Sequence, residues 1–204
     1  MTGALEIIAA LLASGLASCA LRRDLGVSPL WAWLAPIGFV ACLTLTLTAI
    51  GAEFRIAIVI ASITAVCVLI GEIDRRSQII PDILVVAVLA LAAVAPFDDH
   101  ALVRVFGALF VGALFYAIHA AFNLAGREDA LGLGDVKLAL ALGAFHGAYW
   151  GLVAVALAGI GTIAALTASY AVSRNQSALV GAPFGVGLAA ALCIVAAFRL
   201  WGSP

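Results

Sequence analysis

Charged residues are scarce in this sequence. Aspartate, glutamate, lysine and arginine together make up 10% of its 204 residues, whereas hydrophobic residues make up 66%. A soluble domain typically has about 25% charged residues and roughly 45–50% apolar ones. A chain of this composition cannot cover itself with polar surface in water. This excludes an ordinary water-soluble fold and predicts that lipid surrounds the protein.

Other features are also missing. No polar stretch is long enough to form a soluble domain, and there is no basic tail that would indicate a nucleic-acid partner. The cysteines stand singly in apolar surroundings, without any C-x-x-C pair, so we interpret them as packing residues rather than metal ligands. They are Cys19, Cys42, Cys67 and Cys193.

Long apolar runs dominate the chain. A membrane-spanning helix needs about 20 apolar residues, so the runs predict an all-α, polytopic transmembrane bundle of about seven or eight helices. The candidate spans are 4–21, 30–51, 55–73, 82–97, 101–124, 133–148, 150–172 and 181–200. The spans 82–97 and 133–148 are short. Each is tilted, extended by flanking residues or incomplete.

Basic residues are unevenly shared between the two sides of the predicted bundle. Cytoplasmic connections of membrane proteins are enriched in lysine and arginine. One side collects Arg22, Arg23, Arg75, Arg76, Arg127, Arg174 and Lys137. The other side has Arg55, Arg104 and Arg199. We therefore expect the first side to face the cytoplasm and the amino terminus to be periplasmic.

Two aspartates are predicted to reach the same membrane depth. Asp74 closes the third span and Asp135 opens the sixth, and alternating spans place both ends on the cytoplasmic side. Ionisable groups at such positions are costly, which makes them functional candidates. Two adjacent carboxyl groups share a proton and titrate as a unit. The ionised one can activate water and the protonated one can polarise an amide carbonyl, a chemistry that cleaves peptide bonds.

Two glycines precede Asp135. Gly132 and Gly134 allow close backbone approach and conformations that other residues avoid, so a substrate strand could pair with their amides. The simpler explanation is that they mark a helix start. The carboxylates also leave open a small proton-coupled membrane transporter, although no clear internal repeat supports it. A non-enzymatic subunit is a third alternative, against which both intact aspartates argue.

Two motifs resemble those of the prepilin peptidase family. Residues 74–82 read DRRSQIIPD, similar to the family's pattern of aspartate, six residues and Pro-Asp. Residues 132–138 read GLGDVKL, which matches the family's GxGDxKL. The segments 139–143 and 183–185 also resemble family sequence, so the resemblance covers roughly residues 55–200. Presenilin-like proteases share GxGD, but their Tyr-Asp context is absent.

The resemblance implies an aspartic endopeptidase of the bacterial inner membrane that acts at the cytoplasmic face. Its substrates would be type IV prepilins or pseudopilins, whose short basic leader is cut from a hydrophobic helix. Asp74 and Asp135 would form the catalytic pair. Asp82 would support the first motif and Lys137 the second.

The sequence departs from the long members of that family. Those have a cytoplasmic insertion with paired C-x-x-C motifs and methyltransferase activity, whereas the first connection here covers only residues 22–29. We expect no zinc, no other cofactor and no methylation, as in short peptidase-only members such as those serving tight-adherence pili. We divide the chain into residues 1–54, two helices of unknown role, and 55–204, the peptidase-like domain. The oligomeric state is left open.

The remaining polar residues near the motifs have simpler explanations. Asp82 lies at a helix start, where an acidic side chain suits the helix dipole, and Lys137 can snorkel to the surface. Glu72 points away from the catalytic candidates and is expected to pair with an arginine. Because the expected leader is basic, Glu128 and Asp129 are better candidates to bind it than Arg75 and Arg76.

Overall fold

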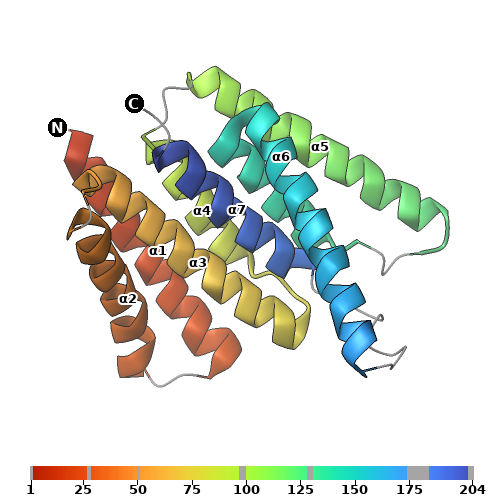
Figure 1. The fold of residues 1–204 in the computed structure, drawn as a ribbon, viewed down its shortest axis with the longest axis horizontal. Coiled ribbons are helices and arrows are strands. Elements are labelled where there is room, and N and C mark those ends of the chain that lie inside the picture. The colour runs from red at the N-terminus through yellow and green to blue at the C-terminus, as the bar shows by residue number, and fades with distance from the viewer. Residues whose placement is uncertain are drawn as a thin grey trace.

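The computed structural model describes residues 2–26, 29–49, 51–96, 100–127, 131–173 and 184–201. Within these ranges the chain forms seven α-helices and no strand (Figure 1). They are α1 (Thr2–Leu25), α2 (Pro29–Ala49), α3 (Phe54–Ser77), α4 (Asp82–Val94), α5 (Ala101–Leu124), α6 (Leu133–Ser173) and α7 (Phe184–Trp201). The predicted all-α bundle is confirmed.

Several of these helices are suited to lipid. Among the described residues, Phe54–Ser77, Ala101–Leu124 and Leu133–Ala168 are long and apolar enough to cross a membrane. Large hydrophobic side chains on α5, including Leu102, Phe106 and Leu109, are more than half exposed. Such a surface is stable against acyl chains but not in water. The chain is therefore a membrane protein.

Helix α6 consists of two arms that meet at a break. Gly147 has φ 76° and ψ 178°, a conformation that glycine adopts without steric cost. The second arm turns back from this break (Figure 1). A Cβ on Gly151 would lie 3.3 Å from the Cα of Gly143 on the first arm. This reversal confirms that the predicted spans 133–148 and 150–172 are two separate helical arms, while the topology stays a prediction.

Two helices near the aspartates are short. Helix α4 has 13 residues and the first arm of α6 covers 133–146. At about 1.5 Å per residue each is about 20 Å long, against a hydrocarbon core of about 30 Å. As helices alone, neither reaches across this core, and the three possibilities left open by the sequence stay predictions.

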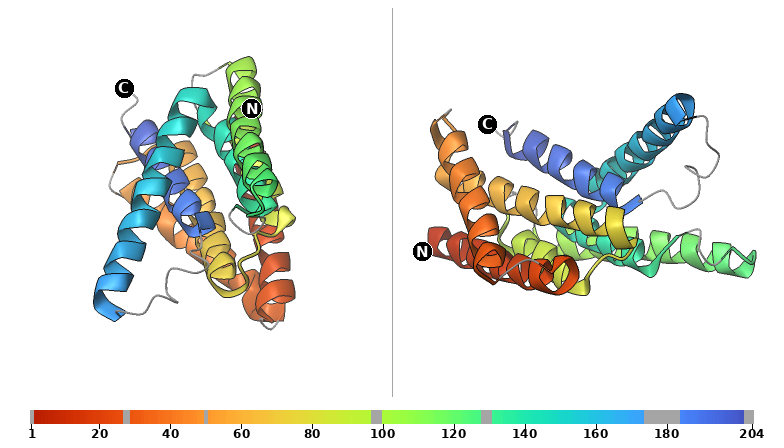
Figure 2. Two further views of the ribbon diagram at one scale, coloured as in Figure 1. Left: turned by 90° about the vertical axis from the view of Figure 1, so that its right-hand side faces the viewer. Right: turned by 90° about the horizontal axis from the view of Figure 1, so that it is seen from below.

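Helix α3 is central to the bundle. It packs against α1, α2, α4 and α7, while α6 packs against α4, α5 and α7 (Figure 2). Helix α1 contributes a face of small buried residues, including Ala13, Ala17 and Ala20, at the three- or four-residue spacing of one helix side. The N-terminal helices thus pack directly on the helices that carry the first motif. The division at residue 54 stays a prediction.

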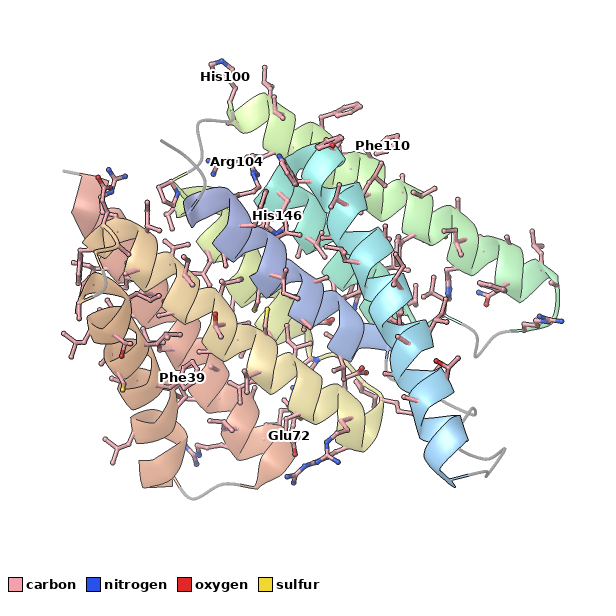
Figure 3. The ribbon with its side chains drawn as sticks, in the orientation of Figure 1. Phe39, Glu72, His100, Arg104, Phe110 and His146 are labelled. Atoms are coloured by element: carbon pink, nitrogen blue, oxygen red, sulfur yellow. The ribbon has the colours of Figure 1, made fainter. Side chains whose placement is uncertain are left out.

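Two basic residues at the end opposite the aspartates bind helix carbonyls. Arg104 donates to the carbonyl oxygens of Ala92 at 2.7 Å and Ala95 at 2.9 Å, where α4 ends. Arg199 donates to the carbonyl oxygen of His146 at 2.9 Å, directly before the break in α6. Figure 3 shows Arg104 and His146 at one end of the bundle and Glu72 at the other. These arginines satisfy terminal carbonyls that would otherwise lack partners.

Candidate active site

A pocket of about 740 Å³ opens where α3 ends and where α4 and α6 begin. Its walls come from the end of α1, the last turn of α3, the segment 78–81, the start of α4 and residues 132–137. Both Asp74 and Asp135 line it. The prediction that these two residues arrive at the same end of the bundle is therefore confirmed.

Asp74 lies in the last turn of α3 and is only 5% exposed. The helix continues to Ser77, beyond the predicted end at residue 73, so Asp74 is held inside a helical turn. Its Oδ2 accepts a hydrogen bond from the backbone N–H of Val186 at 3.1 Å, and the N–H of Gly185 also donates to this carboxylate. Free N–H groups at a helix start favour an anion, so α7 both orients Asp74 and accommodates its charge.

Asp135 lies in the first turn of α6 and is partly buried. Its Oδ2 lies beside Gly132, and its carboxylate is close enough to Asp74 for their charges to interact. Two ionised carboxylates that line one partly enclosed pocket repel each other, which favours a state in which one of them is protonated. Such an arrangement suits acid–base chemistry.

The two glycines of the second motif both line the pocket. A Cβ on Gly134 would lie 3.1 Å from Cβ and 3.4 Å from the backbone N of Ile80, so the predicted close approach is confirmed at this position. The predicted unusual conformation is wrong. Among the described glycines, positive φ occurs at Gly26, Gly51, Gly126 and Gly147. Gly134 is already inside α6, where the packing against Ile80 demands space rather than an unusual φ.

An ion pair joins the two motifs across the pocket. Lys137 Nζ donates to Asp82 Oδ1 at 2.7 Å, with side chains that are 51% and 72% exposed. Lys137 thus has a specific partner and does more than snorkel. Asp82 also opens α4, where its charge suits the helix dipole. The ion pair connects the start of α4 to the start of α6 at the edge of the pocket.

We expect Asp82→Asn to lower the free energy of unfolding by less than about 1 kcal/mol, because exposed ion pairs contribute little. Thermal unfolding in detergent measures this change. Glu53→Gln, an exposed acid at the other end of α3, gives the baseline for losing one surface charge. A loss of several kcal/mol for Asp82→Asn, without a similar loss for Glu53→Gln, would contradict the small contribution expected of the Asp82–Lys137 ion pair.

Glu72 lies outside the pocket lining. It accepts hydrogen bonds from Arg75 Nε at 3.1 Å and Nη2 at 3.0 Å, and it also pairs with Arg76. Figure 3 shows Glu72 near the end of α3. The predicted arginine partner is confirmed, and the charge of Glu72 is compensated on the surface of its own helix.

Some predicted contributors lie outside the described residues. These are Glu128 and Asp129, considered for leader binding, and Pro183 of the segment 183–185. Among the residues that the structure does describe, no group of three or more histidine, cysteine or acidic side chains is placed to hold a metal ion.

Sequence reasoning missed three parts of the site. The first is the pair of α7 amides that bind Asp74, although the family-like segment 183–185 gave a signal at that place. The second is His119 on α5, whose Nδ1 lies 2.7 Å from the carbonyl oxygen of Leu131 and so anchors the chain before Gly132. The third is the end of α1, where Arg23 and Asp24 line the pocket.

Comparison with known proteins identifies the family of this chain. A model of the type IV leader peptidase family matches residues 61–169, a segment that contains both Asp74 and Asp135. No curated protein and no solved structure matches the chain. The family match covers more than half of the 204 residues. The protein is therefore a membrane peptidase that belongs to the type IV leader peptidase family.

Proposed function

We propose that the protein is an aspartic endopeptidase that removes the leader from type IV prepilins or pseudopilins, with Asp74 and Asp135 as its catalytic pair. One observation carries the proposal: aspartates from two separate motifs line a single pocket at one end of the bundle. The match to the leader peptidase family supports the substrate class. A transporter gains no comparable support.

The proposed reaction divides acid and base between the two carboxyl groups. The ionised carboxylate takes a proton from a water molecule as its oxygen attacks the peptide carbonyl carbon. The protonated carboxyl donates to the carbonyl oxygen, and the leaving nitrogen takes up a proton as the C–N bond breaks. The products are a new carboxyl terminus on the leader and a new amino terminus on the pilin. The α7 amides would keep Asp74 in place while it is charged.

We infer that this site faces the cytoplasm in a bacterial inner membrane. The end of the bundle that holds the pocket includes Arg22, Arg23, Arg75 and Arg76, as cytoplasmic ends do. On the opposite end, Arg104 and Arg199 bind helix carbonyls. That structural role explains why these two arginines lie at that end. The other basic residues therefore still favour a pocket on the cytoplasmic side.

Cleavage by the purified protein tests the proposal. In detergent or lipid it should cut a prepilin between its basic leader and its hydrophobic helix, and mass spectrometry of both products identifies the bond. A folded preparation that leaves every prepilin offered to it intact would overturn the assignment.

The contact between α7 and Asp74 gives a sharper prediction. A Cβ on Gly185 would lie 2.8 Å from Asp74 Oδ2 and 2.8 Å from Ile80 Cδ1, so Gly185→Ala must displace the carboxylate. Misplacement of a reacting group by about 1 Å can cost about 10²-fold in rate. We expect a loss of this order in the cleavage rate of a prepilin, measured at saturating substrate.

Gly71→Ala is the matched control for this variant. Its Cβ would lie 3.8 Å from Val186 Cγ1, an ordinary contact one turn before Asp74 on the same helix. We expect it to retain cleavage. Equal rates for wild type and Gly185→Ala would show that Asp74 does not depend on α7 for its position.

A further inference from the structure

The end of α1 forms one wall of the pocket. Arg23 and Asp24 line it together with Asp74 and Asp135. Both belong to α1 and precede residue 61, where the match to the leader peptidase family begins. Residues 1–54, whose role is unknown from the sequence, therefore contribute part of the pocket.

Helix α1 is firmly placed relative to the two motifs. It packs against α3, which carries Asp74, and against α4, which begins at Asp82. The contact face includes Ala17, Ala20 and Ser18, each at most 1% exposed, so the helices approach closely. Tight packing of this kind fixes the end of α1 beside the pocket.

The two charged residues at the end of α1 differ in exposure and are only weakly paired with each other. The side chain of Arg23 is 88% exposed, whereas that of Asp24 is 27% exposed. Their closest charged atoms are 3.9 Å apart, which makes a weak and solvent-screened pair. Asp24 can therefore accept a better-placed cation from a ligand at little cost.

The pocket as a whole favours a basic ligand. Its described lining residues include four aspartates, namely Asp24, Asp74, Asp82 and Asp135, and two cations, namely Arg23 and Lys137. Even when the catalytic pair keeps one proton, negative charge exceeds positive charge. A cleft of one net sign attracts and orients ligands of the other sign.

We propose that Asp24 binds a basic side chain of the leader peptide and thereby helps to select the substrate. This inference rests on the function proposed above. The other acids of the pocket are engaged, because Asp82 pairs with Lys137 at 2.7 Å and the remaining two carry the chemistry. Asp24 is thus a specificity-determining residue, and α1 supplies it to the site.

The test compares two substrates that differ only in leader charge. One is a prepilin with its basic leader, and the other has the leader lysines and arginines replaced by glutamine. We expect Asp24→Asn to lower the preference for the basic leader, as a ratio of kcat/KM values, by about tenfold, mainly through KM. Asp24→Glu should restore most of the preference. Glu53→Gln, at the far end of α3, should leave the ratio unchanged.

Each result decides a separate question. An equal loss on both substrates would show a structural role and would overturn this inference while leaving the peptidase assignment intact. Failure of the wild-type protein to cut either substrate would overturn both. Should Asp24→Asn not fold, the salt dependence of the wild-type preference decides, because the ratio must fall as ionic strength rises. A ratio that is independent of salt would reject Asp24 as the binding group.

Discussion

We expect Asp74→Asn and Asp135→Asn each to abolish leader cleavage while leaving the bundle folded. General acid and base groups typically contribute about 10²–10⁴-fold to the rate, and each aspartate here is expected to serve in both parts of the cycle. Asparagine has nearly the same shape, and its carbonyl oxygen can still accept the hydrogen bond from Val186 N–H. The loss should therefore appear in cleavage and not in thermal unfolding.

The two substitutions should also be strongly non-additive. When two groups act as one unit, removing either costs about as much as removing both. The double variant is thus expected to be no slower than the single ones. Rates from mass spectrometry of leader and mature products, collected over long incubations, measure all three.

Glu72→Gln is the control for the loss of a carboxylate on this part of α3. Glu72 is two residues from Asp74 but is held by Arg75 and Arg76 outside the pocket lining. The Glu72→Gln variant should cleave the prepilin at close to the wild-type rate. If either asparagine variant cleaved as fast as this control, that aspartate would have no part in the mechanism.

The sequence predicts the architecture well because the apolar runs are long and their ends carry polar residues. That Asp74 and Asp135 lie at the same end of the bundle follows from alternation of the spans alone. The reversal at Gly147 was likewise expected as a boundary between two spans. These predictions need only the order of the helices along the chain and the side of the membrane on which each one begins.

The neighbours of each helix could not be predicted in this way. Periodicity does not show that α7 lies against α3, so the bond from Val186 to Asp74 was missed. The same applies to Cys67 on α3 and Cys193 on α7, which read as isolated packing residues but lie in side-chain contact. Asp24 falls within the predicted connection 22–29, and its place beside the pocket could not be predicted because it depends on how α1 packs.

The second large effect is expected where α5 crosses α6. A Cβ on Gly107 would lie 2.5 Å from the carbonyl oxygen of Gly143 and 2.5 Å from the carbonyl carbon of Gly147. A Cβ on Gly143 would collide with the carbonyl oxygen of Gly107. These are backbone atoms that cannot rotate away, so any side chain must push the helices apart. In lipid, helix association depends on such close packing because the hydrophobic effect adds little between helices.

Gly143→Ala should therefore destabilise the protein by about 1–3 kcal/mol, the usual range for overpacking, and Gly143→Val by more. Thermal unfolding in detergent and the fraction recovered as a single species in gel filtration measure this. Gly159→Ala is the matched control on the second arm of α6, because nothing lies within 4 Å of its added Cβ. It should be neutral or slightly stabilising, since alanine is the better helix former.

The effect should also reach the site. The first arm of α6 presents Asp135 at one end and carries Gly143 two turns further along, so separating it from α5 shifts Asp135 relative to Asp74. Cleavage by Gly143→Ala should fall even at temperatures where the protein remains folded. A variant as stable and as active as wild type would mean that α5 does not hold this arm. The positioning of Asp135 would then have to come from α4 and α7 alone.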